Sequence, residues 1–383
     1  MVNVSRKSFF GGMTAAVALG CGGCSSTLID QEQRIAVPAK DWKPAARWRG
    51  FNLLGMFRCP SIGLKPDPRV EGHFVEWEFK ALREWGFNFA RLPLDYRILI
   101  AEDNWLELDE RKMKHLDDAI TWGRKHAIHV QIALHRIPGY CILDRTEPFP
   151  LGTSPVAQEA ACRMWAAFAK RWKGIPNEDL SFNLFNEPTR HTAGANYLPL
   201  ALKLIKAIRD VDSERFIMAD GNACASMPVP ELYKLRSLGQ AFRGYTPHAL
   251  THYGADFLGG LSKVPPTWPL APGYGRLAPE YGGNLDRRRE LPEATVAKYQ
   301  GAIDAGEFCM VGEFGCRPDV PHDVARAWME HCLKLWRAKN LGWALWNLRG
   351  TFGILDSDRK DVAYEDFNGH KLDRKMLELL MRY

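Results

Sequence analysis

Short apolar runs of strand length alternate with longer segments of helical periodicity from Trp48 to the end of the chain. The predicted strands lie at 48–54, 87–92, 128–134, 180–186, 215–219, 241–246, 308–313 and 342–346. The predicted helices lie at 73–85, 109–126, 155–172, 195–211, 231–238, 292–305, 322–339 and 371–381. Strict alternation implies parallel strand pairing, because each helix returns the chain to the same end of the sheet. A closed barrel and an open doubly wound sheet both satisfy this pattern.

The number of strands and the absence of a nucleotide-binding loop favour the closed barrel. Open sheets that bind nucleotides usually carry a glycine-rich loop after the first strand, and neither G-x-G-x-x-G nor G-x-x-x-x-G-K-[ST] occurs there. Barrels of eight strands reach this length as one unit. The sequence therefore predicts a single-domain α/β protein, a (β/α)8 TIM barrel over residues 45–383.

Polar or aromatic residues close most of the predicted strands. In a barrel the carboxyl ends of all strands meet at one face, and barrel enzymes build their sites there. A polar side chain at such a position costs free energy unless it is paired or used. The candidates found in this way are Asn52, Arg91, His135, Asn186, Glu187, Tyr245, Glu313 and Trp346.

Two strand ends carry a glutamate within a distinctive motif. The run LFNEP at 184–188 contains Glu187, and the run VGEFG at 311–315 contains Glu313. Cleavage of a glycosidic bond needs two carboxyl groups, one to protonate the leaving oxygen and one to attack the sugar carbon. The pair therefore points to such a site if the fold brings distant strand ends together. Two unrelated surface glutamates are the alternative.

Composition argues against nucleic acid as a partner. The 383 residues are 46% hydrophobic and 25% charged, and the net charge of +6 is spread along the chain. The densest basic run, at 287–289, lies between Asp286 and Glu290, which is typical of a solvated loop. A neutral carbohydrate demands no charge bias.

The cysteines predict neither a metal site nor a disulfide framework. Two of the nine lie at Cys21 and Cys24, which leaves seven without regular spacing. One or two bridges are compatible with this number. The only C-x-x-C pair is Cys21 and Cys24 itself, in the N-terminal segment, so we expect no metal and no other cofactor.

The first 24 residues have the features of an export signal. Arg6 and Lys7 form a basic start, and the apolar stretch at 9–19 is too short to span a bilayer. The start is similar to a twin-arginine signal, with Lys7 in place of the second arginine. We expect the signal at 1–24 to be followed by a linker at 25–44.

The end of this signal loosely resembles a lipobox. Cys21 would then carry lipid and tether the protein to a membrane, although Ala18 stands where leucine is usual. A signal without lipidation is the alternative. We expect an exported protein that is periplasmic, bound to the outer membrane as a lipoprotein, or extracellular.

Together these motifs resemble glycoside hydrolase family 5, the cellulase-like family of retaining glycosidases in clan A. The resemblance covers about residues 45–383 and rests mainly on Asn186-Glu187-Pro188, the run VGEFG and Trp346. It implies a retaining hydrolase that acts on an oligo- or polysaccharide of β-linked glucose, mannose or a related sugar. It is also compatible with a monomer.

The resemblance implies a role for each strand-end residue. Glu187 would be the general acid and base, with a pKa above that of free glutamate, and Glu313 would stay ionised as the nucleophile. Arg91 would hold Glu313 ionised and correctly aimed. The other substrate-binding candidates are Asn52, Asn186, His135, Tyr245, His252 and Trp346. A turn-forming asparagine, a structural ion pair and a buried core histidine are the purely structural alternatives for Asn186, Arg91 and His135.

The sixth predicted strand departs from the family pattern, which has His-x-Tyr there. The segment reads RGYTPHALTHY over 243–253. Aligning Tyr245 with the family tyrosine puts Arg243 in the place of histidine, whereas aligning His248 leaves no tyrosine two positions on. We prefer Tyr245 in the site, with His252 as a further sugar contact. Both Arg243 and His248 stay open for the role of the histidine.

The leading hypothesis is an endo-β-1,4-glucanase that acts by double displacement. The same catalytic residues would serve a β-mannanase, a xyloglucanase or an enzyme for another β-glucan, in endo or exo mode. A non-catalytic carbohydrate-binding protein on the same barrel is an alternative from another class. It predicts the loss of one carboxylate, and both are present.

Overall fold

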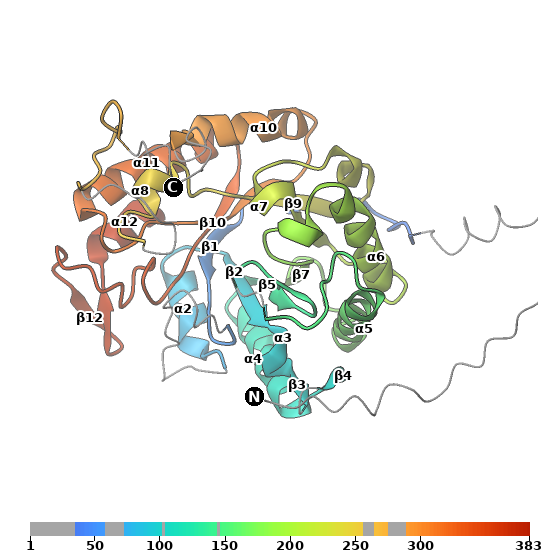
Figure 1. Cartoon of the computed structure of the whole chain (residues 1–383). Helices are drawn as coiled ribbons and strands as arrows, with labels where there is room; N and C mark the ends of the chain where they lie inside the picture. Colours follow the sequence, from blue (N-terminus) through green and yellow to red (C-terminus); the bar gives the residue numbers. More distant parts are fainter. Residues whose placement is uncertain (1–34, 58–72, 102–103, 144–145, 256–263, 275–288) are drawn as a thin grey trace, which may run out of the picture. The chain divides into compact units, whose positions relative to one another are not determined.

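The computed structural model describes residues 35–57, 73–101, 104–143, 146–255, 264–274 and 289–383. Eight parallel strands form a closed barrel (Figure 1), which confirms the predicted (β/α)8 fold. They are β1 (Arg49–Asn52), β2 (Phe89–Asp95), β5 (His129–Ile137), β7 (Leu180–Asn183), β8 (Ile217–Asp220), β9 (Leu238–Arg243), β10 (Cys309–Phe314) and β11 (Gly342–Leu345). The ring closes because β1 pairs with both β2 and β11, and β2 pairs with β5. The short β6 (Tyr140–Cys141) turns back on β5 at the rim.

Helices surround the barrel largely as predicted. They are α2 (Glu76–Glu84), α4 (Glu110–Lys125), α5 (Pro155–Arg171), α6 (Tyr197–Arg209), α10 (Pro292–Asp304), α11 (His322–Ala338) and α12 (Arg374–Met381). The helix predicted at 231–238 is wrong. The chain forms the 3-10 turn η4 (Pro230–Lys234) there, and Leu238 already begins β9 because it pairs with Ile217 of β8.

Local sequence explains where two of these helices begin. The side chain of Asp109 accepts a hydrogen bond from the Arg111 amide at 2.9 Å and so caps α4. Pro155 opens α5, where its fixed φ suits the first helical position and its missing N–H costs nothing. The buried face of α4 contains Met113, Leu116 and Ile120 at helical spacing, which attaches the helix to the barrel.

The barrel interior is apolar at its base and polar above it. At the amino ends of the strands, a buried cluster contains Trp48, Phe89, Phe216, Met218, Ala241, Met310 and Ala344. Directly beside this cluster, where the His129 ring stacks on Trp48, the Ser181 hydroxyl lies 2.8 Å from His129 Nε2 and accepts a hydrogen bond from Gln131. Strand side chains alternate between the inside and the outside, and each interior layer is formed by inward residues from alternate strands. These polar side chains lie below the charged groups at the carboxyl ends of the strands.

The segment just before β1 packs against the base of the barrel. The Trp42 amide donates to Ser237 Oγ at 2.9 Å, and the Trp42 ring meets Phe216 edge to face. The Asp41 carboxylate accepts from the Ser237 amide at 2.6 Å. Residues 35–44, which the sequence assigned to a linker at 25–44, thus belong to the same compact unit as the barrel. The expected signal at 1–24, with Cys21, lies outside the described residues.

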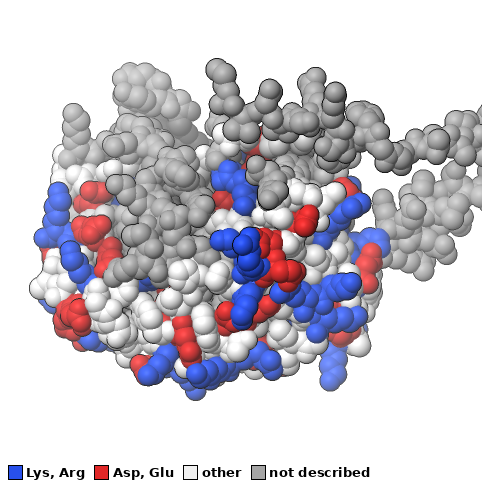
Figure 2. All heavy atoms as spheres, turned by 90° about the horizontal axis from the view of Figure 1, so that it is seen from below, with Lys and Arg blue, Asp and Glu red and all other residues white. Residues whose placement is uncertain are grey.

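Charges of both signs are mixed on the face shown in Figure 2. Among the charged side chains of the described residues, some form ion pairs one helical turn apart, such as Lys114 with Asp118 and Lys206 with Asp210. Within the described residues, no helix reaches the length and apolarity that a bilayer crossing requires.

Gly50 provides a test of how closely the barrel strands approach one another. A Cβ at this buried position of β1 would lie 1.7 Å from the Phe89 carbonyl oxygen of β2, so Gly50→Ala must push two paired strands apart. We expect this substitution to lower the free energy of unfolding by several kcal/mol or to abolish folding (on the order of 3 kcal/mol for overpacking). Urea unfolding followed by circular dichroism measures the loss.

Gly301 is the matched control for this substitution. It lies within α10, is exposed, and a Cβ there would have no neighbour within 4 Å. Gly301→Ala should leave stability unchanged or raise it by about 0.5–1 kcal/mol, because alanine favours the helix. Equal effects of the two substitutions would contradict the assigned strand contact.

Candidate active site

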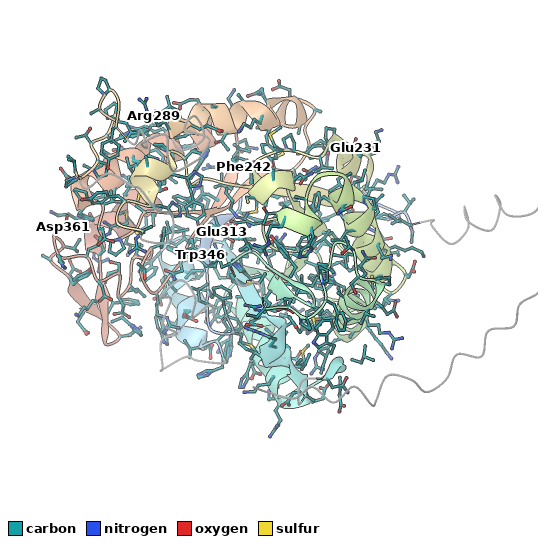
Figure 3. All side chains as sticks on the ribbon, in the orientation of Figure 1. Glu231, Phe242, Arg289, Glu313, Trp346 and Asp361 are labelled. Carbon is teal, nitrogen blue, oxygen red and sulfur yellow. The ribbon has the colours of Figure 1, made fainter. Side chains whose placement is uncertain are left out.

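The carboxyl ends of the barrel strands bring residues far apart in the sequence into one buried cluster. Figure 3 labels Glu313 and Trp346 toward the middle of the view, whereas Glu231 and Asp361 lie at its edges. Asn52, Arg91, His135, Asn186 and Glu313 are all nearly inaccessible to solvent. Because the strands converge at this end, a distance of many residues along the chain becomes contact in space.

Glu313 is held by two arginines and a tyrosine. Its Oε1 accepts a hydrogen bond from Arg91 Nη1 at 2.6 Å and lies 3.2 Å from Arg243 Nη2. Its Oε2 accepts from the Tyr245 hydroxyl at 3.2 Å. Burial and the nearby carboxylates Glu313 and Glu187 raise the pKa of Tyr245 well above its ordinary value, so it remains a donor. The cations balance the buried carboxylate, and both oxygens are fixed in direction.

Arg91 is itself fixed from three sides. Its guanidinium donates to Asn52 Oδ1 at 2.9 Å, to Asn183 Oδ1 at 3.1 Å and to Asn186 Oδ1 at 3.0 Å. Asn52 in turn donates to the carbonyl oxygens of Gly312 and Leu345. Asn52 therefore lies below the carboxylates and orients Arg91, rather than standing at the surface of the site.

Glu187 lies just beyond β7, where the backbone turns sharply. Its φ is +47°, and its amide donates to Asp220 Oδ2 at 2.8 Å. Its Oε1 accepts from Arg243 Nε at 2.7 Å. Burial raises the pKa of Glu187 to about 7; the Arg243 cation opposes this rise, and the Glu313 carboxylate adds to it. The two glutamates thus share Arg243, while Glu187 has a raised pKa.

Asn186 connects the two arginines to His135. Its Oδ1 accepts from Arg91 and from Arg243, the latter at 2.7 Å, so its Nδ2 must be the donor toward His135 Nε2 at 3.3 Å. Burial and the neighbouring arginines hold the pKa of His135 well below its ordinary value. The ring is therefore neutral, with its proton on Nδ1, which lies 3.9 Å from Glu313 Oε1.

Aromatic side chains form a wall beside the carboxylates. The Trp346 ring lies 5.2 Å from the His135 ring and 5.8 Å from Phe57, centroid to centroid. Trp346 also clusters with Tyr245. Phe57 was not among the predicted site residues, because it follows the first strand in a loop rather than closing it.

The end of β9 shows that Arg243, and not His248, lies beside the two glutamates. Arg243 is the last residue of β9 and contacts both glutamates, whereas His248 begins the short helix α8 (His248–Thr251) outside the barrel strands. His252 is half-buried beside Tyr245, with the two rings 5.4 Å apart. His252 thus supports Tyr245 and is one step removed from the carboxylates.

Asp220 is the functional residue that sequence reasoning missed. It ends β8, is fully buried, and forms an ion pair with Arg243. Its Oδ1 also accepts from Asn183 at 3.2 Å. The strand predicted at 215–219 stops one residue before it, so the same criterion of a polar strand end would have found it.

Within the described part of the chain, no group of three or more His, Cys, Asp or Glu side chains is arranged to hold a metal ion. The acidic groups of the site are instead balanced by Arg91 and Arg243. The buried Cys309, Cys316 and Cys332 are free thiols and form no disulfide.

A parallel barrel whose strand ends bring two buried glutamates together, one of them with a raised pKa, fits a glycoside hydrolase. Comparison with known proteins agrees. The family model described as cellulase (glycosyl hydrolase family 5) matches residues 78–351. The chain belongs to this family and is a glycosyl hydrolase.

Relatives and solved structures extend this result over most of the chain. Endoglucanase C of Acetivibrio thermocellus is 27% identical over 345 residues, which cover 83% of this chain and 96% of the relative. A crystal structure of a glycoside hydrolase is 32% identical, with a TM-score of 0.74, and covers 88% of this chain and 99% of its own. Endoglucanase Cel5A from Thermotoga maritima shares the fold, at 20% identity, 87% and 96% coverage and a TM-score of 0.64.

The raised pKa of Glu187 predicts a pH-dependent cost in stability. A folded pKa of about 7 lies above the ordinary value of 4.5, so the folded state prefers the protonated carboxyl. The resulting stability is fully present below about pH 4.5 and is lost as the pH rises through about 7. Glu187→Gln removes this titration and should be more stable than the natural protein at pH 8, by up to about 3 kcal/mol.

Thermal unfolding between pH 4.5 and 8 measures this difference. The gap between Glu187→Gln and the natural protein should widen across the interval. Glu231→Gln is the matched control, because Glu231 is exposed at the edge of the molecule (Figure 3). A constant gap for Glu187→Gln would contradict the assigned environment.

Proposed function

We propose that this enzyme is a retaining endo-β-1,4-glucanase with Glu187 as general acid and base and Glu313 as nucleophile. The observation that carries this proposal is the unequal surroundings of two glutamates that share Arg243. Glu313 is paired with two cations, which favour an ionised nucleophile. Glu187 has a pKa raised to about 7, which favours a group that can both give and take a proton near neutrality.

In the first step, Glu313 Oε2 attacks the anomeric carbon and the bond to the leaving oxygen breaks. Oε2 suits this role because it accepts one neutral hydrogen bond, whereas Oε1 is held by charged donors. Glu187 gives its proton to the leaving oxygen, so the alcohol departs neutral. A covalent glycosyl ester on Glu313 results.

In the second step, the ionised Glu187 takes a proton from water as the water attacks the anomeric carbon. The sugar–ester bond breaks, Glu313 regains its charge, and Glu187 regains its proton. The sugar leaves with the configuration it had at the start. Trp346 and the neutral His135 are suited to bind the sugar in the site, one by stacking and one by donating from Nδ1.

The choice of glucan is supported by the relatives. Endoglucanase C covers nearly the whole barrel, and its name assigns it to an internal cut in a glucan. A β-mannanase remains the second candidate, since the structures of Thermotoga maritima Cel5A include one with mannotriose. Glucose and mannose differ at the 2-hydroxyl, which by the family resemblance would meet Asn186.

A panel of soluble glycans tests the substrate. We expect the purified enzyme to cut carboxymethyl cellulose and mixed-linkage β-glucan internally, which lowers viscosity faster than it releases reducing ends. Glu313→Gln should reduce this activity by about 10⁴-fold or more, because no nucleophile remains. Preferred cleavage of mannan, or release of single sugars from chain ends, would replace the proposed substrate or mode while keeping the chemistry.

Glu187→Ala separates the two proposed roles. Loss of the acid should cost about 10²–10⁴-fold on natural glycans, but much less in the first step with a dinitrophenyl cellobioside, whose leaving group needs no proton. Azide should then restore turnover and give the β-cellobiosyl azide, since azide needs no base. The same treatment of Glu313→Gln should give no β-cellobiosyl azide, and formation of that product by this variant would reverse the assignment.

We also propose that the chain is exported and tethered through Cys21. The basic start at 6–7 and the short apolar stretch at 9–19 support this proposal. Expression of the full chain in bacteria, followed by fractionation, should place the enzyme in the membrane fraction. Cys21→Ala should move it to a soluble fraction outside the cytoplasm, and cytoplasmic retention of both forms would contradict the proposal.

A further inference from the structure

Arg243 is bound to three carboxylates from three other strands or strand ends. Its Nε donates to Glu187 Oε1 at 2.7 Å, and its Nη2 pairs with Asp220 Oδ2 and lies 3.2 Å from Glu313 Oε1. The side chain is almost completely buried. An arginine shared by both glutamates departs from the histidine that the family pattern places here, so this chain must meet the charge requirements of its site differently.

The neighbouring strand β10 leaves space for the guanidinium of Arg243. A Cβ at Gly312 of β10 would lie only 2.9 Å from Arg243 Nη1 and 3.2 Å from the Ala241 Cβ. The absence of a side chain at Gly312 therefore leaves room for the guanidinium beneath the two glutamates. The position of Arg243 is consequently determined by packing as well as by charge.

The charges of the cluster balance before the sugar is attached. With Glu187 protonated, the negative groups are Asp220 and Glu313, and the positive groups are Arg91 and Arg243. Two negative and two positive charges leave the buried cluster neutral. This matters because an unbalanced buried charge costs several kcal/mol.

The charges balance again after the first step of the proposed reaction. Glu313 is then an uncharged ester, and Glu187 has lost its proton to the leaving group. The negative groups are then Asp220 and Glu187, and the positive groups are still Arg91 and Arg243. With a neutral side chain at position 243, both states would carry one excess negative charge.

We propose that Arg243, held in place by Asp220, is a positioning residue that serves the two glutamates in turn, balancing Glu313 before the sugar is attached and Glu187 afterwards. This inference rests on the proposed roles of Glu187 and Glu313. Arg243 does not need to touch the sugar. It leaves the buried cluster without net charge in both the free enzyme and the glycosyl-enzyme, so the proton can leave Glu187 and return to it without an uncompensated charge.

The pH dependence of the site depends on Glu187 and on the titratable or charged groups that surround it. They are Asp220 from β8, Arg243 from β9, Glu313 from β10, Tyr140 from β6, Tyr245 after β9, Arg91 from β2 and His135 from β5. Burial keeps the pKa of Tyr140 and Tyr245 above their ordinary value and that of His135 below it. The pH dependence near neutrality is therefore assigned to Glu187.

Two substitutions with opposite charge effects test the inference. The natural enzyme should lose kcat/KM on a natural glycan as the pH rises through about 7, because Glu187 must be protonated for the first step. Arg243→Met removes the shared cation, so the pH at which kcat/KM falls (the alkaline limb of the profile) should rise by about one unit or more. Asp220→Asn removes a nearby negative charge, so the limb should move to lower pH.

The second step supplies an independent readout. With dinitrophenyl cellobioside the breakdown of the glycosyl-enzyme limits turnover, and it needs Glu187 ionised as a base. Arg243→Met should lower kcat there by about 10-fold or more near pH 7, and azide should restore it. Arg243→Lys keeps the charge, so its pH limb should stay close to that of the natural enzyme, and its unfolding temperature checks that the fold persists.

Each outcome decides the matter. Opposite shifts of the two limbs, with azide rescue of Arg243→Met, support the proposal. The proposal is contradicted if the alkaline limbs of kcat/KM do not move in variants that fold. It is also contradicted if azide does not restore kcat in Arg243→Met. In either case Arg243 is only a structural partner of Asp220. Failure of Glu187→Ala to respond to azide would instead overturn the proposed roles of the glutamates, independently of Arg243.

Discussion

The site depends on the pairing of its buried carboxylates with two cations, Arg91 and Arg243. Carboxylates that are fully removed from water are costly, and Glu313 and Asp220 are tolerated because each meets a guanidinium. The same contacts fix the directions of the carboxylate oxygens. The burial of Glu187 is only partly offset by Arg243, and its pKa rises accordingly. Stability and proposed chemistry therefore come from the same few contacts.

The barrel makes this cluster feasible by its layering. Apolar side chains fill the base, a hydrogen-bonded layer with Gln131 and Ser181 follows, and the asparagines below the carboxylates orient Arg91. The asparagines accept hydrogen bonds from Arg91, so its buried charge meets polar groups. Replacing the family histidine by Arg243 fits this scheme, because the adjacent Asp220 and the small Gly312 provide charge and space.

Much of the fold could be predicted because its signals are local. The eight strands and the main helices follow from apolar periodicity, and the start of α4 follows from the capping side chain of Asp109. Errors occurred where pairing outweighed the local pattern. Leu238 was assigned to a helix but pairs with Ile217 in the sheet, and residues 35–44 read as a linker but pack against the barrel base.

The sequence by itself determined which side chains stand at the strand ends, because the alternation of strands and helices places every strand end at one face. That was sufficient to name Glu187, Glu313, Arg91, Asn186 and Trp346. Only the tertiary structure decided which of them touch. It showed that Arg243 rather than His248 joins the glutamates, and that Asn52 and His252 act from behind. Contacts between distant strand ends depend on barrel register and side-chain direction, which no local pattern records.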